Sequence, residues 1–268
     1  MSESTLSLSF NDLQAEVGSF LGWGSGPNPP YNDGAWTPFQ QQRILSAVKS
    51  GLRNFFFPTP PQGGPTYDWS FLRPVATLGL SSSAQTVQLP DDFGGFEGQI
   101  TLLTTKGMLW HPIQLVNEGQ VRERYSFSPN VTGRPQVAAL QPLKGTTATA
   151  GQRWQLFLYP QADQAYTLQF TYYLLCDFLD GGFPFPLGGM AHAETILESC
   201  LAVAEQRQDD AQGVHTANFL TRLAASIAAD RRNKAQTLGY NRDLSDGPRF
   251  GLRRDHLQDR IMYKGVQY

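Results

Sequence analysis

The chain has 268 residues, of which 40% are hydrophobic and 16% are charged, and its formal net charge is −2. This length and apolar content suffice for one large domain or two small ones, and the small net charge gives no general electrostatic reason to bind nucleic acid. Charged residues are scarce for a globular protein, whereas Gly (26), Pro (18) and aromatic residues (12%) are frequent. This composition is typical of a protein whose surface is partly covered in an assembly, and equally of an ordinary loop-rich β protein.

The two cysteines, Cys176 and Cys200, lie in hydrophobic segments without CxxC spacing, which argues against a disulfide framework or a zinc site. The N-terminal stretch 1–10 is polar and rich in serine, so we expect no secretory signal. No apolar run approaches the length of a transmembrane helix, so we expect no membrane span. We therefore expect a soluble protein made in the cytoplasm.

Two helices are predicted near the N-terminus. Apolar residues at three- and four-residue steps predict a helix over 10–21, capped by Asn11 or Asp12, and a Gly- and Pro-rich loop follows over 22–34. Thr37 and Pro38 have the pattern of an N-cap followed by proline at the first helical position. The second helix should end at the proline run over 58–61. Its apolar stripe comprises Phe39, Ile44, Leu45, Val48, Leu52, Phe55 and Phe56.

A β-rich zone follows, in which no helical period is evident, and it favours an antiparallel sheet or a small sandwich. Alternation is clearest over 166–172, where apolar and aromatic side chains share one face. The stretch 159–163 has the composition of a hairpin turn, and 91–95 that of a turn whose glycines supply positive φ. The predicted strands are 75–80, 86–89, 99–103, 136–140, 154–159 and 166–175.

Helical periodicity returns after Gly188 and Gly189, with an apolar side that runs from Met190 to Ala204. A polar break over 206–213 separates this helix from a second one, which carries Phe219, Leu220, Leu223 and Ile227 and should end near Gly239. Residues 240–268 have no period but carry spaced apolar anchors, a pattern that suits an extended tail that orders on a partner.

The predicted fold class is therefore α+β. We expect N- and C-terminal helices to form one bundle, with an antiparallel β domain inserted between them and an extended C-terminal tail. The predicted division is 1–66 for the N-terminal helices and loop, 67–186 for the β domain, 187–239 for the C-terminal helices and 240–268 for the tail.

Catalytic and metal-binding patterns are weak. His192 has no second histidine four residues away, so a zinc site is not indicated, and a partly exposed histidine at a helix start is the favoured interpretation. Glu194 and Glu198 share one helix face, where solvated surface is a commoner role than an acid/base pair. No phosphate-binding loop or nucleophile elbow is present. We expect no enzyme activity, no cofactor and no metal.

Several segments together resemble a known family. Between the two pairs of helices come residues 67–74 (YDWSFLRP), 89–95 (LPDDFGG), 134–136 (RPQ) and 158–160 (LYP). This order resembles the head-to-tail adaptor proteins of tailed bacteriophages, including the tail tubular protein A type of short-tailed phages. The resemblance covers roughly residues 7–235.

The resemblance implies a structural virion protein of the phage neck, made in the host cytoplasm. Such a protein forms a homo-oligomeric, dodecameric ring below the portal protein, presents a platform for the next neck or tail protein, and lets DNA pass without specific binding. Aromatic residues are candidates for the contacts between subunits, or alternatively for the core where helices meet the β domain. These aromatic residues are Trp36, Phe55, Phe56, Trp69 and Phe71.

In such adaptors a C-terminal segment often docks on the portal, and residues 240–268 are the candidate here. We expect apolar side chains to enter portal grooves and arginines to pair with portal carboxylates, with terminal disorder as the alternative. The candidate docking residues are Arg249, Phe250, Leu252, Arg253, Arg254, Ile261, Met262 and Tyr263.

Two other functions are compatible with the sequence. One is a different structural position in the virion, such as tail completion or a nozzle-like element, which differs in its partner and not in its chemistry. The other is a cell-wall hydrolase, for which Glu194 and Glu198 would be the acid and base.

Overall fold

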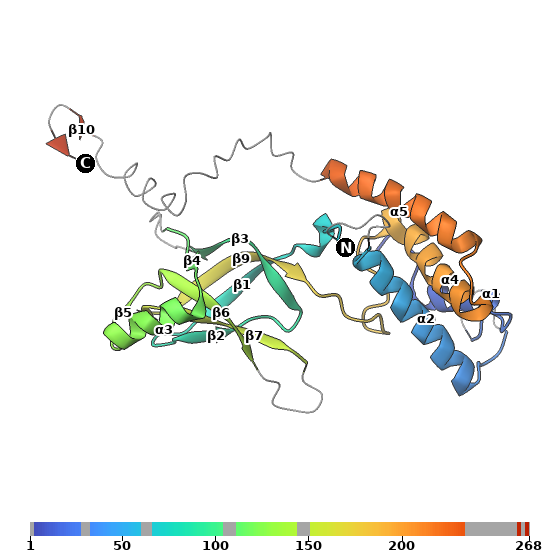
Figure 1. Ribbon diagram of the computed structural model, residues 1–268, viewed down its shortest axis with the longest axis horizontal. Coiled ribbons are helices and arrows are strands. Elements are labelled where there is room, and N and C mark those ends of the chain that lie inside the picture. The colour runs from blue at the N-terminus through green and yellow to red at the C-terminus, as the bar shows by residue number, and fades with distance from the viewer. Residues whose placement is uncertain are drawn as a thin grey trace. The chain divides into compact units, whose positions relative to one another are not determined.

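The computed structural model describes residues 3–27, 33–59, 66–103, 111–143 and 151–233, together with the backbone of 262–263 and 266–267. Over these residues the protein is mixed α+β. Its helices are α1 (Phe10–Phe20), α2 (Pro38–Phe56), α3 (Glu118–Phe127), α4 (Ala193–Asp209) and α5 (Val214–Asn233), with 3-10 turns η1 (Ser70–Leu72) and η2 (Met190–His192) (Figure 1). All of these belong to the first of two compact units, Met1–Asn233 and Lys234–Tyr268.

The starts of α1 and α2 are both fixed by reciprocal capping boxes. The predicted cap of α2 is confirmed, because the Thr37 hydroxyl accepts a hydrogen bond from the backbone N of Gln40 while the Gln40 side chain accepts one from Thr37. The prediction for α1 is wrong. Ser9 is its N-cap, and Asp12 is the third residue of the box, where its carboxylate accepts the backbone N–H of Ser9 at 2.8 Å.

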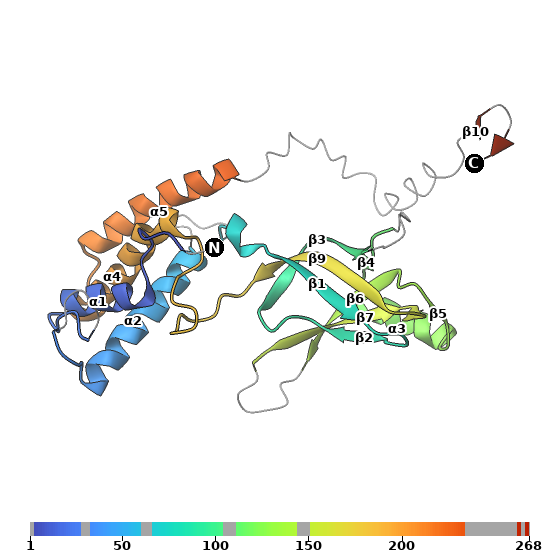
Figure 2. The same cartoon turned by 180° about the vertical axis from the view of Figure 1, so that it is seen from behind.

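Helices from both halves of the sequence share one apolar core. α4 packs against α1, α2 and α5, and α1 also packs on α2 (Figure 2). A Cβ at Gly51 would lie 2.6 Å from the Cα of Cys200, so the backbones of α2 and α4 approach as closely as a glycine allows. The buried members of this helical core include Leu13, Val17, Ile44, Val48, Leu52, Phe55, Trp69, Leu72, Ile196, Cys200 and Leu223.

Three residues assigned to apolar helix faces by periodicity lie outside this core. Phe39, Met190 and Leu220 are 62%, 49% and 44% exposed. Phe39 lies in the first turn of α2, and Met190 lies in η2 before α4 begins. Periodicity identifies a helix face, but the extent of the neighbouring helix decides which part of that face is covered.

The strands form two main sheets. One has three antiparallel strands in the order β1-β9-β3, and the other has four in the order β2-β7-β6-β4. Their bounds are β1 (Val75–Leu80), β2 (Thr86–Gln88), β3 (Phe93–Leu103), β4 (Gln114–Leu115), β6 (Val137–Leu143), β7 (Arg153–Tyr159) and β9 (Tyr166–Leu174); β5 (Thr132–Gly133) and β8 (Gln161–Ala162) form a separate pair.

Alternating side chains of the two main sheets bury one common core. In β9, Tyr166, Leu168, Phe170 and Tyr172 are all buried, which confirms the alternation predicted for this strand. They pack in one cluster with side chains of β1, β3 and β7, such as Leu156.

The β-rich zone differs from its prediction in two respects. It contains α3, which the sequence did not predict because Val121 is the only buried residue of that helix and the apolar stripe is correspondingly thin. It is also not wholly antiparallel, since the short pairs β4 with β6 and β5 with β8 are parallel.

Of the two predicted turns, one is wrong and the other is confirmed only in part. Residues 159–163 do not close a hairpin, because β7 pairs with β2 and β6 while β9 pairs with β1 and β3, so this stretch crosses between sheets. The turn predicted over 91–95 is present at its start, where the Phe93 backbone N–H donates to the Pro90 carbonyl at 3.1 Å. The role predicted for its glycines is wrong, because Phe93 begins β3 and both glycines lie within the strand. Positive φ occurs instead at Gly98, where φ is +82° and the pairing of β3 with β9 is irregular.

The second unit is described only in the backbone of β10 (Met262–Tyr263) and β11 (Val266–Gln267), which pair antiparallel. The end predicted for the last helix, near Gly239, lies outside the described residues. Among the helices that the structure describes, none combines the length and apolar character that a membrane span requires.

Candidate functional site

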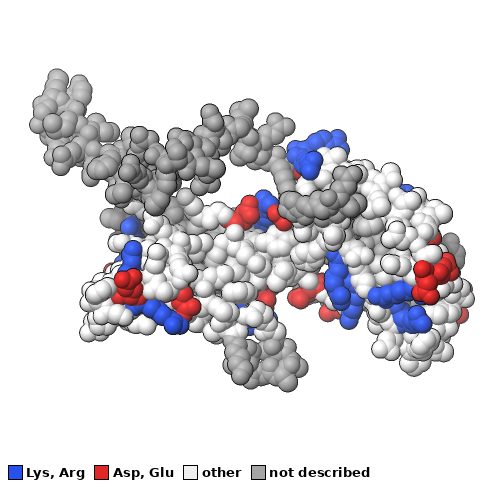
Figure 3. Space-filling model, in the orientation of Figure 1, with Lys and Arg blue, Asp and Glu red and all other residues white. Residues whose placement is uncertain are grey.

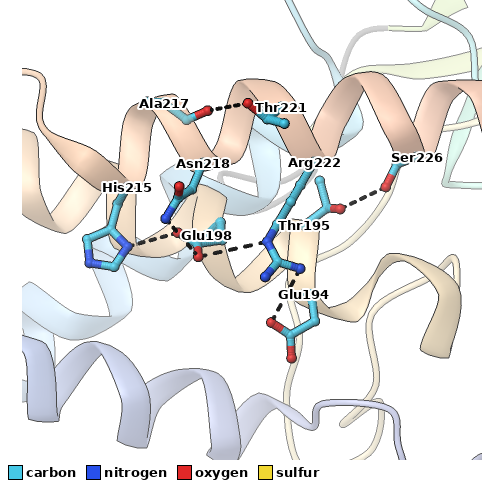
Figure 4. Close-up of polar contacts among 9 residues, drawn as sticks. All are labelled: Glu194, Thr195, Glu198, His215, Ala217, Asn218, Thr221, Arg222 and Ser226. Atoms are coloured by element: carbon cyan, nitrogen blue, oxygen red, sulfur yellow. Dashed lines mark hydrogen bonds and ion pairs between the residues drawn. The ribbon is translucent and has the colours of Figure 1, made fainter.

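The two glutamates considered for acid/base chemistry both lie on the side of α4 that faces α5 (Figure 4). Arg222 of α5 lies beside them, with NH1 3.8 Å from Glu194 Oε2 and Nε 3.9 Å from Glu198 Oε1. The two carboxylates thus share one guanidinium and do not oppose each other across a cleft, as glycoside hydrolysis would require. This arrangement joins α5 to α4.

Glu198 is also bonded to the start of α5. One of its oxygens lies 2.8 Å from His215 Nδ1, and the other accepts a hydrogen bond from the Asn218 amide at 3.5 Å (Figure 4). The Glu198 side chain is only 12% exposed, whereas that of Glu194 is 63% exposed, so the expected solvated role holds for Glu194 alone. The backbone N–H of His215 donates to Glu205 at 3.1 Å, which places carboxylates at the positive end of the α5 dipole.

A buried pair of hydroxyls continues the same contact. Thr195 Oγ1 of α4 and Ser226 Oγ of α5 lie 2.7 Å apart (Figure 4). Over the described residues, no group of three or more His, Cys, Asp or Glu side chains is arranged to hold a metal ion. The polar side chains between α4 and α5 therefore set the alignment of the two helices.

His192 lies in an aromatic cluster just before α4. It is 5% exposed, so the expected partly exposed histidine is wrong, and its ring centroid lies 5.2 Å from that of Trp69 and 5.4 Å from that of Phe71. Its Nδ1 is buried, and no described residue forms a hydrogen bond with it. Burial in this apolar environment lowers the pKa of His192, and the nearby Asp230 carboxylate opposes that shift.

Asp230 joins α5 to the segment that enters the β region. It is 2% exposed, and its carboxylate accepts hydrogen bonds from the Tyr67 hydroxyl at 2.7 Å, from the Ser70 backbone N–H at 3.1 Å and from the Ser70 hydroxyl. Burial, with the Asp230 hydrogen bond, raises the pKa of Tyr67 to about 12. These bonds anchor η1, and hence the start of β1, on the helices.

A groove of about 310 Å³ lies between the start of α2 and the end of α4. We call it the α2/α4 groove; its lining residues are Leu21, Trp23, Phe39, Arg43, Ala47, Ala204, Arg207 and Gln208. The Arg43 guanidinium lies over the Phe39 ring, 5.5 Å from its centroid. Arg207 donates to the hydroxyls of Ser46 and Ser50, at 2.9 and 2.6 Å.

The charge of the groove comes from its two arginines. Over the part of the chain that the structure describes, no carboxylate lies within ion-pair distance of Arg43 or Arg207. An aromatic-lined groove with two uncompensated guanidinium groups suits an apolar side chain that has a carboxylate next to it.

The connection between β9 and α4 exposes large apolar side chains. Phe183 is 77% exposed and Phe185 is 39% exposed, in a segment fixed by a hydrogen bond from the Phe10 backbone N–H to the Pro184 carbonyl. Elsewhere Phe127, at the end of α3, is 80% exposed. On the face drawn in Figure 3, charged side chains form small groups between wide uncharged areas.

The five aromatic residues predicted at subunit contacts differ in burial. Phe55, Phe56 and Trp69 are 0%, 4% and 0% exposed and lie in the helical core, which is the alternative role left open for them. Trp36 and Phe71 are half-buried and are the two that have surface to contact another chain. The assignment of these residues to a subunit interface stays a prediction.

The candidate docking tail lies almost wholly outside the described residues. Residues without a described structure are Arg249, Phe250, Leu252, Arg253, Arg254 and Ile261. For Met262 and Tyr263 the backbone is described, in β10, and the side chains are not. Docking on a portal stays a prediction for all eight.

Sequence reasoning missed the groove and the exposed phenylalanines. Arg207 lies in the predicted polar break over 206–213, but α4 continues to Asp209. Phe183 and Phe185 alternate with prolines in a segment that can form neither helix nor strand, and this pattern was the available signal of exposed apolar surface. In comparisons with known proteins, no family model and no curated protein matches this chain.

Proposed function

We propose that this chain is a structural protein of a tailed-bacteriophage virion, which forms a dodecameric ring below the portal, joins head to tail and lets DNA pass. The observation that carries the proposal is the shared core of α1, α2, α4 and α5. Helices from both halves of the sequence meet there, and all strands of the main sheets lie between them in the chain. We interpret this as a helical bundle with an inserted β domain, as in the adaptor family that the sequence resembles.

The surface supports an assembling role. Large apolar side chains are exposed on separate elements, including Leu6, Phe183 and Val214 at 71%, 77% and 70%. Exposed apolar area together with few charges is a mark of surfaces that other proteins cover. A subunit that contacts two neighbours through different patches closes into a ring when the rotation between copies permits.

The proposed partners are further copies of the chain, the portal protein, the next neck or tail protein and the passing DNA. A near-neutral chain suits a channel, because every basic contact with phosphate adds affinity through counterion release and would slow the genome. Residues 240–268 are proposed to dock on the portal. The proposed location is the virion neck, after synthesis in the host cytoplasm.

The proposal is tested by mixing the protein with the cognate portal ring and weighing the complex by native mass spectrometry. A dodecamer of the 29.7 kDa chain adds about 356 kDa to a portal ring of the same symmetry. A gain near that mass supports the adaptor role. No gain contradicts it and favours a position further down the tail, such as tail completion or a nozzle-like element.

The docking segment is tested by deleting residues 241–268. Since the core of the described helices is complete by Asn233, the truncated protein should keep the unfolding temperature of the full chain. We expect it to lose portal binding. Unchanged binding by the truncated protein would exclude a role for the tail.

A further inference from the structure

The α2/α4 groove and the connection between β9 and α4 have complementary chemistry. We call residues 177–187 of that connection the Phe183 loop. The groove offers aromatic walls with Arg43 and Arg207, and neither arginine has a carboxylate within ion-pair distance over the described residues. The Phe183 loop offers a protruding aromatic side chain with two aspartates close by in the sequence.

The Phe183 loop holds Phe183 exposed on a turn that is fixed by hydrogen bonds. One oxygen of Asp180 accepts the backbone N–H groups of Gly182 and Phe183, at 2.7 and 2.8 Å, so the turn before Phe183 is fixed by its own side chain. Phe183 itself is 77% exposed. Asp177 and Asp180 are both exposed, and over the described residues no cation lies within ion-pair distance of either.

The groove is equally pre-formed. Ser46 and Ser50 hold the Arg207 guanidinium by one hydroxyl each, and the ring of Phe39 lies against Arg43. A fixed guanidinium loses little conformational entropy when a carboxylate arrives. The groove volume of about 310 Å³ is at the small end of ligand pockets and admits a single aromatic side chain with its neighbours.

The two surfaces lie at opposite ends of α1. The loop is attached at the start, where the Phe10 N–H bonds to the Pro184 carbonyl at 2.6 Å. Leu21 and Trp23, which line the groove, follow the other end of this 11-residue helix. A helix of that length spans about 16 Å, so one copy presents the loop and the groove at different places. Two such patches produce head-to-tail contacts, which continue from copy to copy.

We propose that the α2/α4 groove of one copy binds the Phe183 loop of a second copy, with Phe183 in the groove and Asp177 and Asp180 beside Arg43 and Arg207. This inference rests on the proposed function, because it names the contact by which the ring would form. It commits to a second copy because the loop carries an exposed aromatic side chain for the aromatic-lined groove, and because the charges of the loop are opposite in sign to those of the groove.

The test uses three full-length variants in sedimentation velocity over a concentration series. Phe183→Ser removes the loop anchor, Arg43→Glu reverses a groove charge, and Phe127→Ser removes an equally exposed phenylalanine from α3 as the control. We expect the wild-type chain and Phe127→Ser to associate alike. Phe183→Ser and Arg43→Glu should each weaken association about tenfold or more, since anchors buried at an interface carry most of its affinity.

An equimolar mixture of the two impaired variants sharpens the test. The Phe183→Ser variant keeps an intact groove and the Arg43→Glu variant keeps an intact loop, so the mixture should form a heterodimer and grow no further. A mixture that stays monomeric overturns the inference. So does association of either impaired variant at the wild-type affinity, and so does a wild-type chain that stays monomeric throughout the series.

The portal experiment separates this inference from the proposed function. If both impaired variants load the portal ring with the full mass gain, the adaptor role stands and the contact between loop and groove is overturned. If the wild-type chain gives no gain while the loop and groove behave as expected, the self-contact stands and the adaptor role is overturned.

Discussion

The helical core and the β core of this protein are specified by different kinds of contact. All the buried Gln, Ser, Thr, His, Glu and Asp side chains of the described residues lie in the helical part, and none lies between 75 and 174; they are Gln14, Ser25, His192, Thr195, Ser199, Glu205, Ser226 and Asp230. The β core consists of aliphatic and aromatic side chains.

The difference has a backbone origin. Strands bond to their neighbours through the main chain, so alternation and ladder geometry set their register without help from buried polar groups. Helices satisfy their backbone internally, so only side chains and close approaches can fix one helix against another. In this protein Ser199 donates to the Gly51 carbonyl of α2 at 2.7 Å, in the helix contact where Gly51 faces Cys200.

The largest effect should come from breaking that close approach. Gly51→Ala would put a Cβ 2.6–2.8 Å from the Cα, Sγ and backbone N of Cys200, and so force α2 away from α4. We expect a loss of about 3 kcal/mol in the free energy of unfolding, measured by chemical denaturation. Alanine has a higher helix propensity than glycine, so propensity alone would make Gly51→Ala stabilising. A loss of stability would therefore report the steric clash with Cys200.

The matched control lies in the β region. Gly79→Ala in β1 would place a Cβ with no atom within 4 Å, so its effect should stay within about 0.5 kcal/mol. Equal stabilities for the two variants would contradict the close helix contact.

The second effect concerns the buried carboxylate between α5 and η1. Asp230→Ala leaves the Tyr67 hydroxyl and the Ser70 N–H without their acceptor, so we expect a loss of about 2 kcal/mol. Asp92→Ala is the comparison in the β region, where a half-buried carboxylate accepts one tyrosine hydroxyl, that of Tyr172, at 3.1 Å. Its loss should be the smaller of the two, and the reverse order would refute the comparison.

The smallest expected effect is a pH dependence of the free energy of unfolding that comes from His192 in the helical part. Burial holds the pKa of His192 below its usual 6.5, so the unfolded chain binds a proton at this histidine more readily than the folded one. The stability that this neutral histidine provides is complete above pH 6.5 and is lost as the pH falls toward the lowered pKa of the folded state.

His192→Phe should remove this contribution. We expect the free energy of unfolding of the variant to fall less steeply than that of the wild-type chain when the pH is lowered below about 6.5. Asp230 is the acidic group that acts on His192, so Asp230→Ala should make the histidine harder still to protonate in the folded state. Parallel pH profiles for the wild-type chain and His192→Phe would show that His192 titrates alike in both states.

Local patterns predicted several regular elements correctly. The predicted strand over 75–80 coincides with β1, and Thr37 caps α2 as expected. α3 escaped prediction because it buries a single side chain, and the supposed hairpin at 159–163 failed because a turn composition does not say which strands will pair.

The α+β class, most helix and strand positions and the alternation of β9 could be predicted from the amino-acid sequence, because they follow from propensity, capping and periodicity within a few residues. The burial of His192 and Asp230, the contact of Gly51 with Cys200, and the groove between the start of α2 and the end of α4 are visible only in the folded protein. Those features join residues far apart in the chain, and no local pattern encodes which distant surface will cover a given side chain.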